Sequence, residues 1–205
     1  MAESMSGKSW TTVTFAPTKN NKMKRNIIVY GLTAGIVVST LMLFNVHCLS
    51  YRDGKFDYDR GLVIGYATML IAFSLVYVGI RNYRDKYNGG VISFGKAFKI
   101  GIMMVLIAST IYVVAWLIDY YFFSTDFMEK YSVAMLDKLK ASGASQIEID
   151  KETKEMASFV RMSKNPLFTA MMTYVEILPV GLIVALISSL ILKRKAEIKM
   201  KETTI

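Results

Sequence analysis

Four long stretches of this chain are apolar on every side, and they constrain its fold more than any other feature. They cover residues 27–49, 61–80, 100–123 and 167–192, and they contain no Lys or Arg and only two acidic residues. About 20 such residues in a helix cross the ~30 Å hydrocarbon core of a bilayer. An open strand would leave its backbone unpaired in lipid, and continuous apolar runs lack the alternation of barrel strands. The sequence therefore predicts an all-α membrane protein, a bundle of four transmembrane helices.

The Lys and Arg residues are divided unevenly between the two sides of the membrane. Of the 25, 15 lie before the first stretch, between the second and third, or after the fourth, and 10 lie in the other two connections. Because the side richer in Lys and Arg faces the cytoplasm, we expect a multi-pass protein with both termini cytoplasmic. The basic residues flank apolar stretches and do not line a soluble face, so the expected partner is the lipid bilayer and not nucleic acid.

Two tails flank the membrane part of the chain. Residues 1–22 are polar and lack the apolar core of a signal peptide, so we expect a disordered tail or a leader. The four-span membrane domain follows over residues 23–195. Residues 196–205 are expected to form a basic cytoplasmic tail.

The connection over residues 124–166 is expected to be helical and extracytoplasmic. Apolar residues recur at helical spacing over about 126–141 and again over about 150–162. Gly143 is well placed to end the first of these helices. An amphipathic pair of this kind can lie on the outer leaflet, cap the bundle or bind a partner, and the sequence leaves these alternatives open.

Glu176 is the residue that we single out as a functional candidate. It lies near the middle of the fourth span, about 14 Å from its outer end at 1.5 Å per residue. A carboxylate at that depth costs about 2.5–3.5 kcal/mol on insertion scales, and no Lys or Arg lies in any span to pair with it. It is either a proton or ligand site, or a protonated acid that joins helices by a hydrogen bond. The hydroxyls at similar depth belong to Ser39, Thr40, Ser109 and Thr110.

Asp119 and His47 form a second candidate. Asp119 lies about 6 Å below the outer end of the third span, and His47 lies near the same level on the first. A contact between them is geometrically possible, although interfacial polar residues more commonly reach water or bond locally. The difference in depth between Asp119 and Glu176 is about 8 Å, which argues against a carboxyl pair.

Small residues and a proline mark positions where helices pack or bend. Gly31 and Gly35 are four residues apart in the first span, and Gly61 and Gly65 have the same spacing in the second. This spacing lets helices approach closely, either within the bundle, which we favour, or in a homodimer. In the fourth span, Pro179 lacks the N–H that would pair with the carbonyl four residues earlier, which predicts a helix kink.

The residues of common catalytic and metal sites are missing from the sequence. The chain has one Cys and one His, too few for a disulfide within the chain or for a Cys/His zinc motif. It also lacks a nucleotide-binding loop and a nucleophile elbow. We therefore expect no enzymatic activity, no metal site and no cofactor.

Several short motifs resemble those of one known family. They are Tyr30-Gly31 with Gly35, Ser93-Phe94-Gly95-Lys96-Ala97-Phe98-Lys99 with Gly101, Glu176 with Leu178-Pro179-Val180-Gly181-Leu182-Ile183, and Leu192-Lys193-Arg194-Lys195. In this order and spacing, over about residues 23–195, the chain resembles the domain-of-unknown-function family 4199, small bacterial inner-membrane proteins. The resemblance implies a four-span protein of the inner (plasma) membrane, and it implies no established activity.

Two functional hypotheses of different classes follow. The leading one is a non-enzymatic accessory or interaction subunit, whose partner is another membrane protein or a second copy of itself. The alternative is an oligomeric transporter or proton-linked carrier that uses Glu176. Four spans are few for a monomeric carrier, and the two halves of the chain show no inverted repeat.

Overall fold

The computed structural model describes residues 19–52 and 55–194. The helices in these ranges are α1 (Lys19–Phe44), the π-helical turn η1 (Asn45–Leu49), α2 (Tyr58–Tyr87), α3 (Phe94–Phe122), α4 (Phe127–Ala141), α5 (Gln146–Met162) and α6 (Pro166–Leu192). Two short strands, β1 (Tyr51–Arg52) and β2 (Lys55–Phe56), pair antiparallel between η1 and α2. Four helices are long and apolar enough to cross a membrane, namely α1 with η1, α2, α3 and α6. The predicted all-α membrane bundle with four spans is confirmed.

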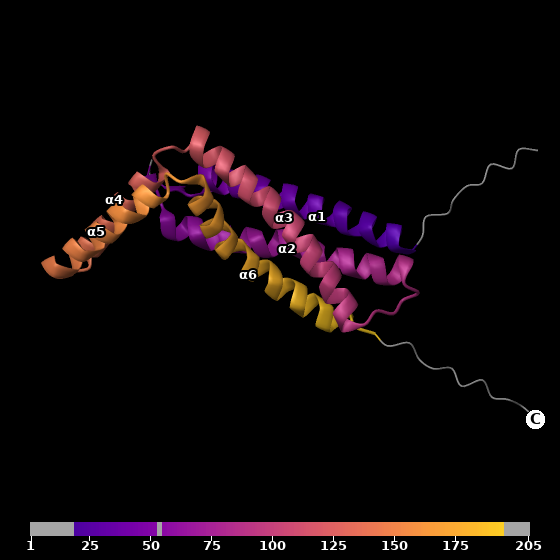
Figure 1. Cartoon of the computed structure of the whole chain (residues 1–205). Coiled ribbons are helices and arrows are strands. Elements are labelled where there is room, and N and C mark those ends of the chain that lie inside the picture. The colour runs from indigo at the N-terminus through magenta and orange to yellow at the C-terminus, as the bar shows by residue number, and fades with distance from the viewer. Residues whose placement is uncertain (1–18, 53–54, 195–205) are drawn as a thin grey trace, which may run out of the picture.

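The four long helices lie side by side (Figure 1). The first, α1, packs against α2 and α3, and α6 packs against the same two helices. As a result, α1 and α6 lie at opposite corners of the bundle. The start of α1 and the end of α6 lie at the same end of the bundle, which we call the terminal end (Figure 1). The pair α4 and α5 projects from the other end, which we call the arm end (Figure 1).

Three of the four helices extend beyond the predicted spans. Helix α2 continues to Tyr87, and α3 already begins at Phe94. Polar residues can continue a helix into water because the backbone hydrogen bonds do not depend on the bilayer. Helix α1 begins at Lys19, so residues 19–22 of the expected tail are helical. The rest of both predicted tails, 1–18 and 195–205, lies outside the described residues.

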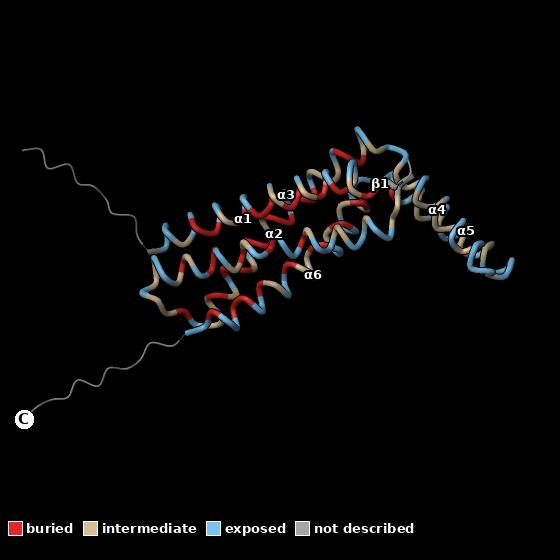
Figure 2. Tube along the Cα trace, turned by 180° about the vertical axis from the view of Figure 1, so that it is seen from behind, coloured by how far each residue is buried: buried red, intermediate tan, exposed pale blue. Residues whose placement is uncertain are grey.

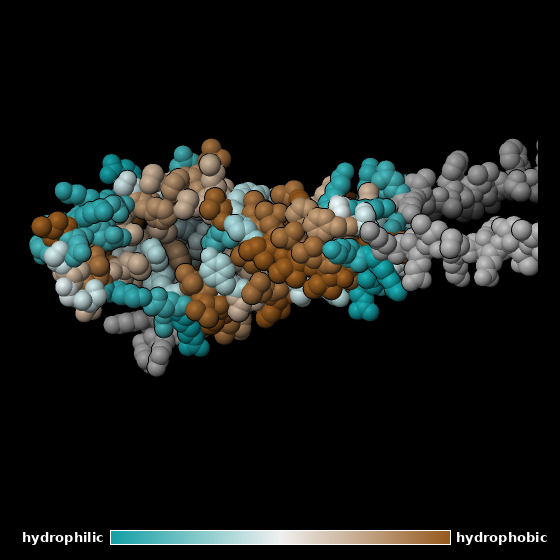
Figure 3. Space-filling view, turned by 90° about the horizontal axis from the view of Figure 1, so that it is seen from below, coloured by the Kyte–Doolittle hydropathy of each residue, from teal (hydrophilic) through white to brown (hydrophobic). Residues whose placement is uncertain are grey.

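Buried side chains line the inside of the bundle, and large apolar side chains cover its outside. Phe73, Met104, Val105, Ile177 and Ala185 are fully buried where the helices meet. Figure 2 shows the buried positions on the inner faces of the long helices. In the space-filling view, hydrophobic side chains cover the middle of the face, and hydrophilic ones gather toward both ends (Figure 3). An apolar belt of this kind matches a hydrocarbon core.

Helices α4 and α5 form a hairpin, which we call the arm. It projects away from the bundle and does not cap it (Figures 1 and 2). Gly143 follows α4 in a left-handed conformation, with φ of 78°. Ser145 and Glu148 form a reciprocal capping box at the start of α5. None of the residues in either helix is buried.

Both ends of the arm are attached to the bundle. At the α5 end, the hydroxyl of Tyr120 donates to Oγ of Ser163 at 3.0 Å. The hydroxyl of Tyr121 donates to the backbone carbonyl of Ser163 at 2.8 Å. At the α4 end, the ring of Tyr58 makes edge contacts with Phe127 and Tyr131. In the last turn of α4, the ammonium of Lys138 pairs with the carboxylate of Asp59 in α2 at 2.7 Å. The arm is therefore held on two sides of its base and farther along α4.

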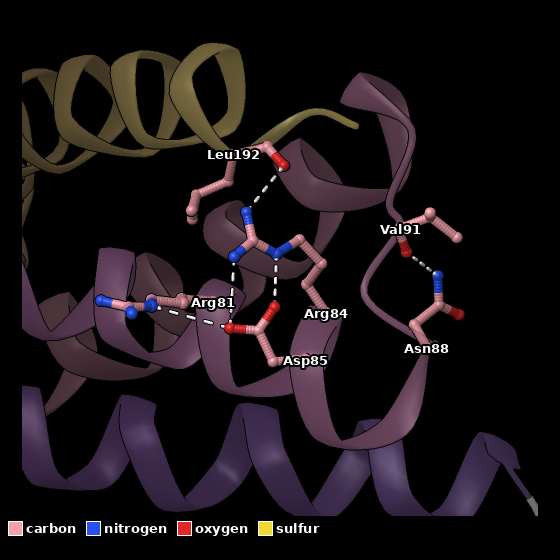
Figure 4. Close-up of polar contacts among 6 residues, drawn as sticks. All are labelled: Arg81, Arg84, Asp85, Asn88, Val91 and Leu192. Atoms are coloured by element: carbon pink, nitrogen blue, oxygen red, sulfur yellow. Dashed lines mark hydrogen bonds and ion pairs between the residues drawn. The ribbon is translucent and has the colours of Figure 1, made fainter. Parts of the chain in front are cut away.

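At the terminal end, the turn between α2 and α3 is joined to the end of α6. The backbones of Ile92 and Arg194 exchange two hydrogen bonds of 3.1 and 2.9 Å. The Arg84 guanidinium donates to the carbonyl of Leu192 at 3.4 Å and pairs with Asp85 (Figure 4). This arrangement, which we call the clasp, fixes the end of α6.

Candidate functional site

A π-helical turn at the arm end of α1 positions the first part of the site. The buried side chain of Asn45 donates to the carbonyl of Gly61 at 2.9 Å and accepts a bond from Ser50 at 2.9 Å. These bonds tie α1 to the start of α2 across the chain reversal. The wider π turn, η1, contains His47. Single π turns occur frequently at functional sites because they redirect side chains within a helix.

His47 contacts Asp119 directly. The distance between Nε2 of His47 and Oδ1 of Asp119 is 2.7 Å, and it joins α1 to α3. The other carboxylate oxygen of Asp119 accepts a bond from the hydroxyl of Ser124 at 3.0 Å. The side chain of Asp119 is only 5% exposed, whereas that of His47 is 46% exposed. A buried carboxylate thus holds one nitrogen of an imidazole that water can reach.

A small pocket of about 40 Å³ lies beside His47, at the base of the arm. Val46 and Tyr58 line it from the bundle, and Ser124, Asp126, Phe127 and Lys130 line it from the junction with the arm. The Lys130 ammonium pairs with the Asp126 carboxylate at 2.6 Å and holds the pKa of that carboxyl below its usual value. The pocket is about the size of one water molecule.

Glu176 lies apart from this cluster, on the outside of the bundle. It is in α6, about 15 Å from the first residue of that helix at 1.5 Å per residue. Its side chain is exposed on the apolar belt. Met172, Val175 and Ile183, on the same side of the helix, are also exposed. The structure therefore presents a carboxyl laterally, where lipid or another protein would meet it.

Glu176 has no hydrogen bond or ion pair within residues 19–52 and 55–194. Of the four hydroxyls expected at its depth, those of Thr40 and Thr110 donate to carbonyls in their own helices. Those of Ser39 and Ser109 are buried and have no partner in the described part of the chain. Tyr112, on α3, is within electrostatic range of Glu176. The predicted hydrogen bond between helices is thus not made by any of these hydroxyls.

The predicted packing glycines lie at close approaches. A Cβ added to Gly31 would lie 3.0 Å from Ile107, and one added to Gly35 would lie 2.6 Å from Ile111, both on α3. In α2, Gly65 faces the amide of Asn45, and the carbonyl of Gly61 accepts from the same amide. These glycines therefore serve contacts inside the bundle.

Pro179 lies within α6, which continues on both sides of it from Pro166 to Leu192. The helix therefore tolerates the missing backbone donor without ending there. The kink itself stays a prediction.

Comparison with known proteins identifies the family. A family model described as "Protein of unknown function (DUF4199)" matches residues 29–194. The chain belongs to this family. No curated protein and no solved structure matches it. The DUF4199 match contains His47, Asp119 and Glu176, so both parts of the candidate site lie within the family's own domain.

The sequence allows a contact between His47 and Asp119 by depth, although local bonding is the commoner outcome for such residues. It does not single out two residues that hold this pair in the DUF4199 chain. Asn45 is a polar residue two positions before His47 in an apolar run. Ser124 follows Asp119 by five residues at the end of a helix, where serine hydroxyls commonly bond nearby groups. Across residues 19–52 and 55–194, no three His, Cys, Asp or Glu side chains are grouped as metal ligands.

Proposed function

We propose that this protein is a non-enzymatic interaction subunit that binds another protein within the plane of the membrane through the side of α6. The observation that carries this proposal is the exposed position of Glu176 in the middle of the apolar belt. The hydroxyls that share the outer surface, such as those of Thr33, Thr40 and Ser74, donate to carbonyls of their own helices. Glu176, by contrast, makes no hydrogen bond or ion pair among the described residues.

The cost of leaving this carboxyl in lipid supports a protein contact. Insertion scales give about 2.5–3.5 kcal/mol for a charged acid at the centre of a span. A hydrogen bond between membrane helices recovers about 0.6–2 kcal/mol, so a partner that offers a donor or acceptor offsets part of this cost. Exposed Met172, Val175 and Ile183 supply apolar contacts around it.

Gentle purification from native membranes, with native mass measurement and quantitative mass spectrometry, tests the proposal. We expect a stoichiometric second protein, or a defined homo-oligomer. Replacing Glu176 by Leu should weaken that complex by about 3–30-fold, which corresponds to one hydrogen bond of 0.6–2 kcal/mol. Ser74→Ala is the matched control, because Ser74 is also exposed on a span but bonds only its own helix.

A monomer without a stoichiometric partner in native-lipid particles would contradict the proposal. So would a complex that tolerates Glu176→Leu as well as it tolerates Ser74→Ala.

A second candidate function is an oligomeric proton-linked carrier that uses the same carboxyl. The observation in its favour is that Glu176 is within electrostatic range of the buried Tyr112, which in turn is near Tyr66 of α2. Tyr112 of α3 is thus within electrostatic range of polar groups on both α2 and α6. Proton flux into liposomes that is lost in Glu176→Gln would favour the carrier, and the absence of flux would favour the interaction subunit.

We further propose that the protein lies in a bacterial inner membrane with the terminal end in the cytoplasm. The uneven distribution of Lys and Arg supports this orientation. Cys48, the single cysteine, is exposed near the arm end and gives a direct test. A membrane-impermeant maleimide should label Cys48 in cells whose outer membrane is permeabilised. Labelling only after the inner membrane is broken would reverse the orientation.

A further inference from the structure

We propose that the contact between His47 and Asp119 is a pH-operated latch that sets how firmly the arm is held against the bundle. The contact joins the end of α1 to the end of α3 at 2.7 Å. It lies at the junction from which α4 begins. This inference concerns the arm and does not depend on the role of Glu176.

The two partners differ in their access to water. The carboxylate of Asp119 is almost fully buried, and it accepts bonds from His47 and Ser124. The half-exposed imidazole is the side chain in this contact that water can reach. Histidine is the side chain whose ordinary titration falls between pH 5 and 8. The bond from a neutral imidazole to this carboxylate has one charged partner, and when both ring nitrogens carry a proton it becomes an ion pair between two charged groups.

The contact is linked to the arm through two short paths. Asp119 binds the hydroxyl and the backbone N–H of Ser124, and the carbonyl of Ser124 accepts from the N–H of Phe127, the first residue of α4. The ring of Phe127 packs edge-on against Trp116 of α3, with 5.2 Å between the ring centroids. A tighter bond between His47 and Asp119 therefore holds the start of α4 more firmly.

Other charged and titratable groups face the same pocket. Asp126 and Lys130 belong to the arm, and Tyr58 belongs to α2. Asp126 and Lys130 form an ion pair with each other. Asp119 is the charged group in direct contact with His47, so a second proton on the imidazole strengthens the junction. The latch is closed when the imidazole of His47 carries both protons, and it loosens when the imidazole is neutral.

Trp116 is a built-in reporter of the latch, because its ring contacts the first residue of the arm. Trp10 is the other tryptophan, and Trp10→Phe leaves Trp116 as the single source of emission. In native-lipid particles, we expect the emission of Trp116 to differ between pH 5 and pH 8. His47→Gln and Asp119→Asn should each abolish this change. Glu129→Gln, an exposed acid of the arm outside the pocket, should leave it intact.

Emission that is constant with pH would overturn the latch. A curve that persists in Asp119→Asn would also overturn it, because the imidazole would then act on Trp116 without the contact. Spin labels measure the arm independently of the tryptophan. With Cys48→Ser, labels at Ser142→Cys on the arm and Leu70→Cys on α2 should give a distance distribution at least 1.5-fold narrower at pH 5 than at pH 8. If the doubly labelled protein folds normally and its distance distribution has the same width at both pH values, the proposal is refuted.

Discussion

Replacing Gly35 by alanine is expected to destabilise the bundle, although the same change stabilises most helices. A Cβ at Gly35 would lie 2.6 Å from Cδ1 of Ile111, 2.9 Å from its Cβ and 3.1 Å from Cα of Ala108. The first of these atoms is the end of a flexible side chain and can move. The other two are fixed by the backbone of α3, so α1 and α3 would have to separate.

The magnitude follows from two opposing effects. Overpacking a well-packed core costs about 1–3 kcal/mol. Replacing a glycine inside a helix gains about 0.5–1 kcal/mol, because less backbone entropy is lost on folding. At the middle of these ranges the net loss is about 1 kcal/mol, and it is at most about 2.5 kcal/mol. A loss of about 1 kcal/mol lowers the folded-to-unfolded ratio by about 5-fold.

Unfolding in mixed micelles, titrated with SDS and followed by circular dichroism, measures this difference. Gly95→Ala is the control, since Gly95 is exposed in the first turn of α3 and an added Cβ there meets nothing within 4 Å. It should be neutral or slightly stabilising. Equal stability of Gly35→Ala and the unmodified protein would refute overpacking between α1 and α3. A change in native mass with unchanged stability would also refute it, because Gly35 would then serve a contact between chains.

Two further predictions concern the arm end. Asn45→Ala removes the bonds to Gly61 and from Ser50, leaves buried groups unpaired and should cost about 1–3 kcal/mol in the same SDS titration; a loss below a few tenths would show that water replaces the amide. The hydrogen bonds from the Ser145 hydroxyl and backbone hold the pKa of Glu148 below its usual value. The capping box therefore stabilises α5 fully at pH values above the ordinary carboxyl pKa. This stabilisation is lost as pH falls through the lowered pKa of Glu148. Amide-exchange protection in the first turn of α5 should fall in acid, and an equal fall in Ser145→Ala would contradict this.

The four spans could be predicted because nothing else in the sequence competes with them. A stretch of apolar residues long enough to cross a bilayer admits a helix and little else. The ends of the helices could not be predicted as well. Tyr83 and Arg84 lie beyond the predicted second span, yet α2 continues through them as far as Tyr87. Backbone hydrogen bonding continues outside the lipid, and composition does not record where it stops.

The surroundings of Glu176 could not be predicted for a different reason. Helix α6 is apolar almost all the way round, so its sequence does not reveal which side faces the bundle. Depth could be counted along the chain, but rotation about the helix axis is set by packing. Gly181, which meets Val105 and Phe73, fixes that rotation and turns Glu176 outward. This contact joins residues that are distant in the sequence.

The pair formed by His47 and Asp119 was within reach of sequence reasoning because both residues lie near the same level. Their approach to 2.7 Å depends on the π turn at Asn45, which redirects His47 toward α3. That turn depends in part on the carbonyl of Gly61, a tertiary partner. Periodicity within one helix does not predict such a turn.

The clasp has a consequence for how the protein is made. Helix α6 is synthesised after the other three spans, and its end is fastened by backbone bonds between Arg194 and Ile92. Its packing at Gly101 and Gly181 also closes the gap between α2 and α3. Until α6 leaves the insertion machinery, α1, α2 and α3 therefore form a three-helix intermediate in the bilayer. A nascent chain halted before α6 should be cut rapidly by membrane proteases, whereas one that includes Arg194 should resist them.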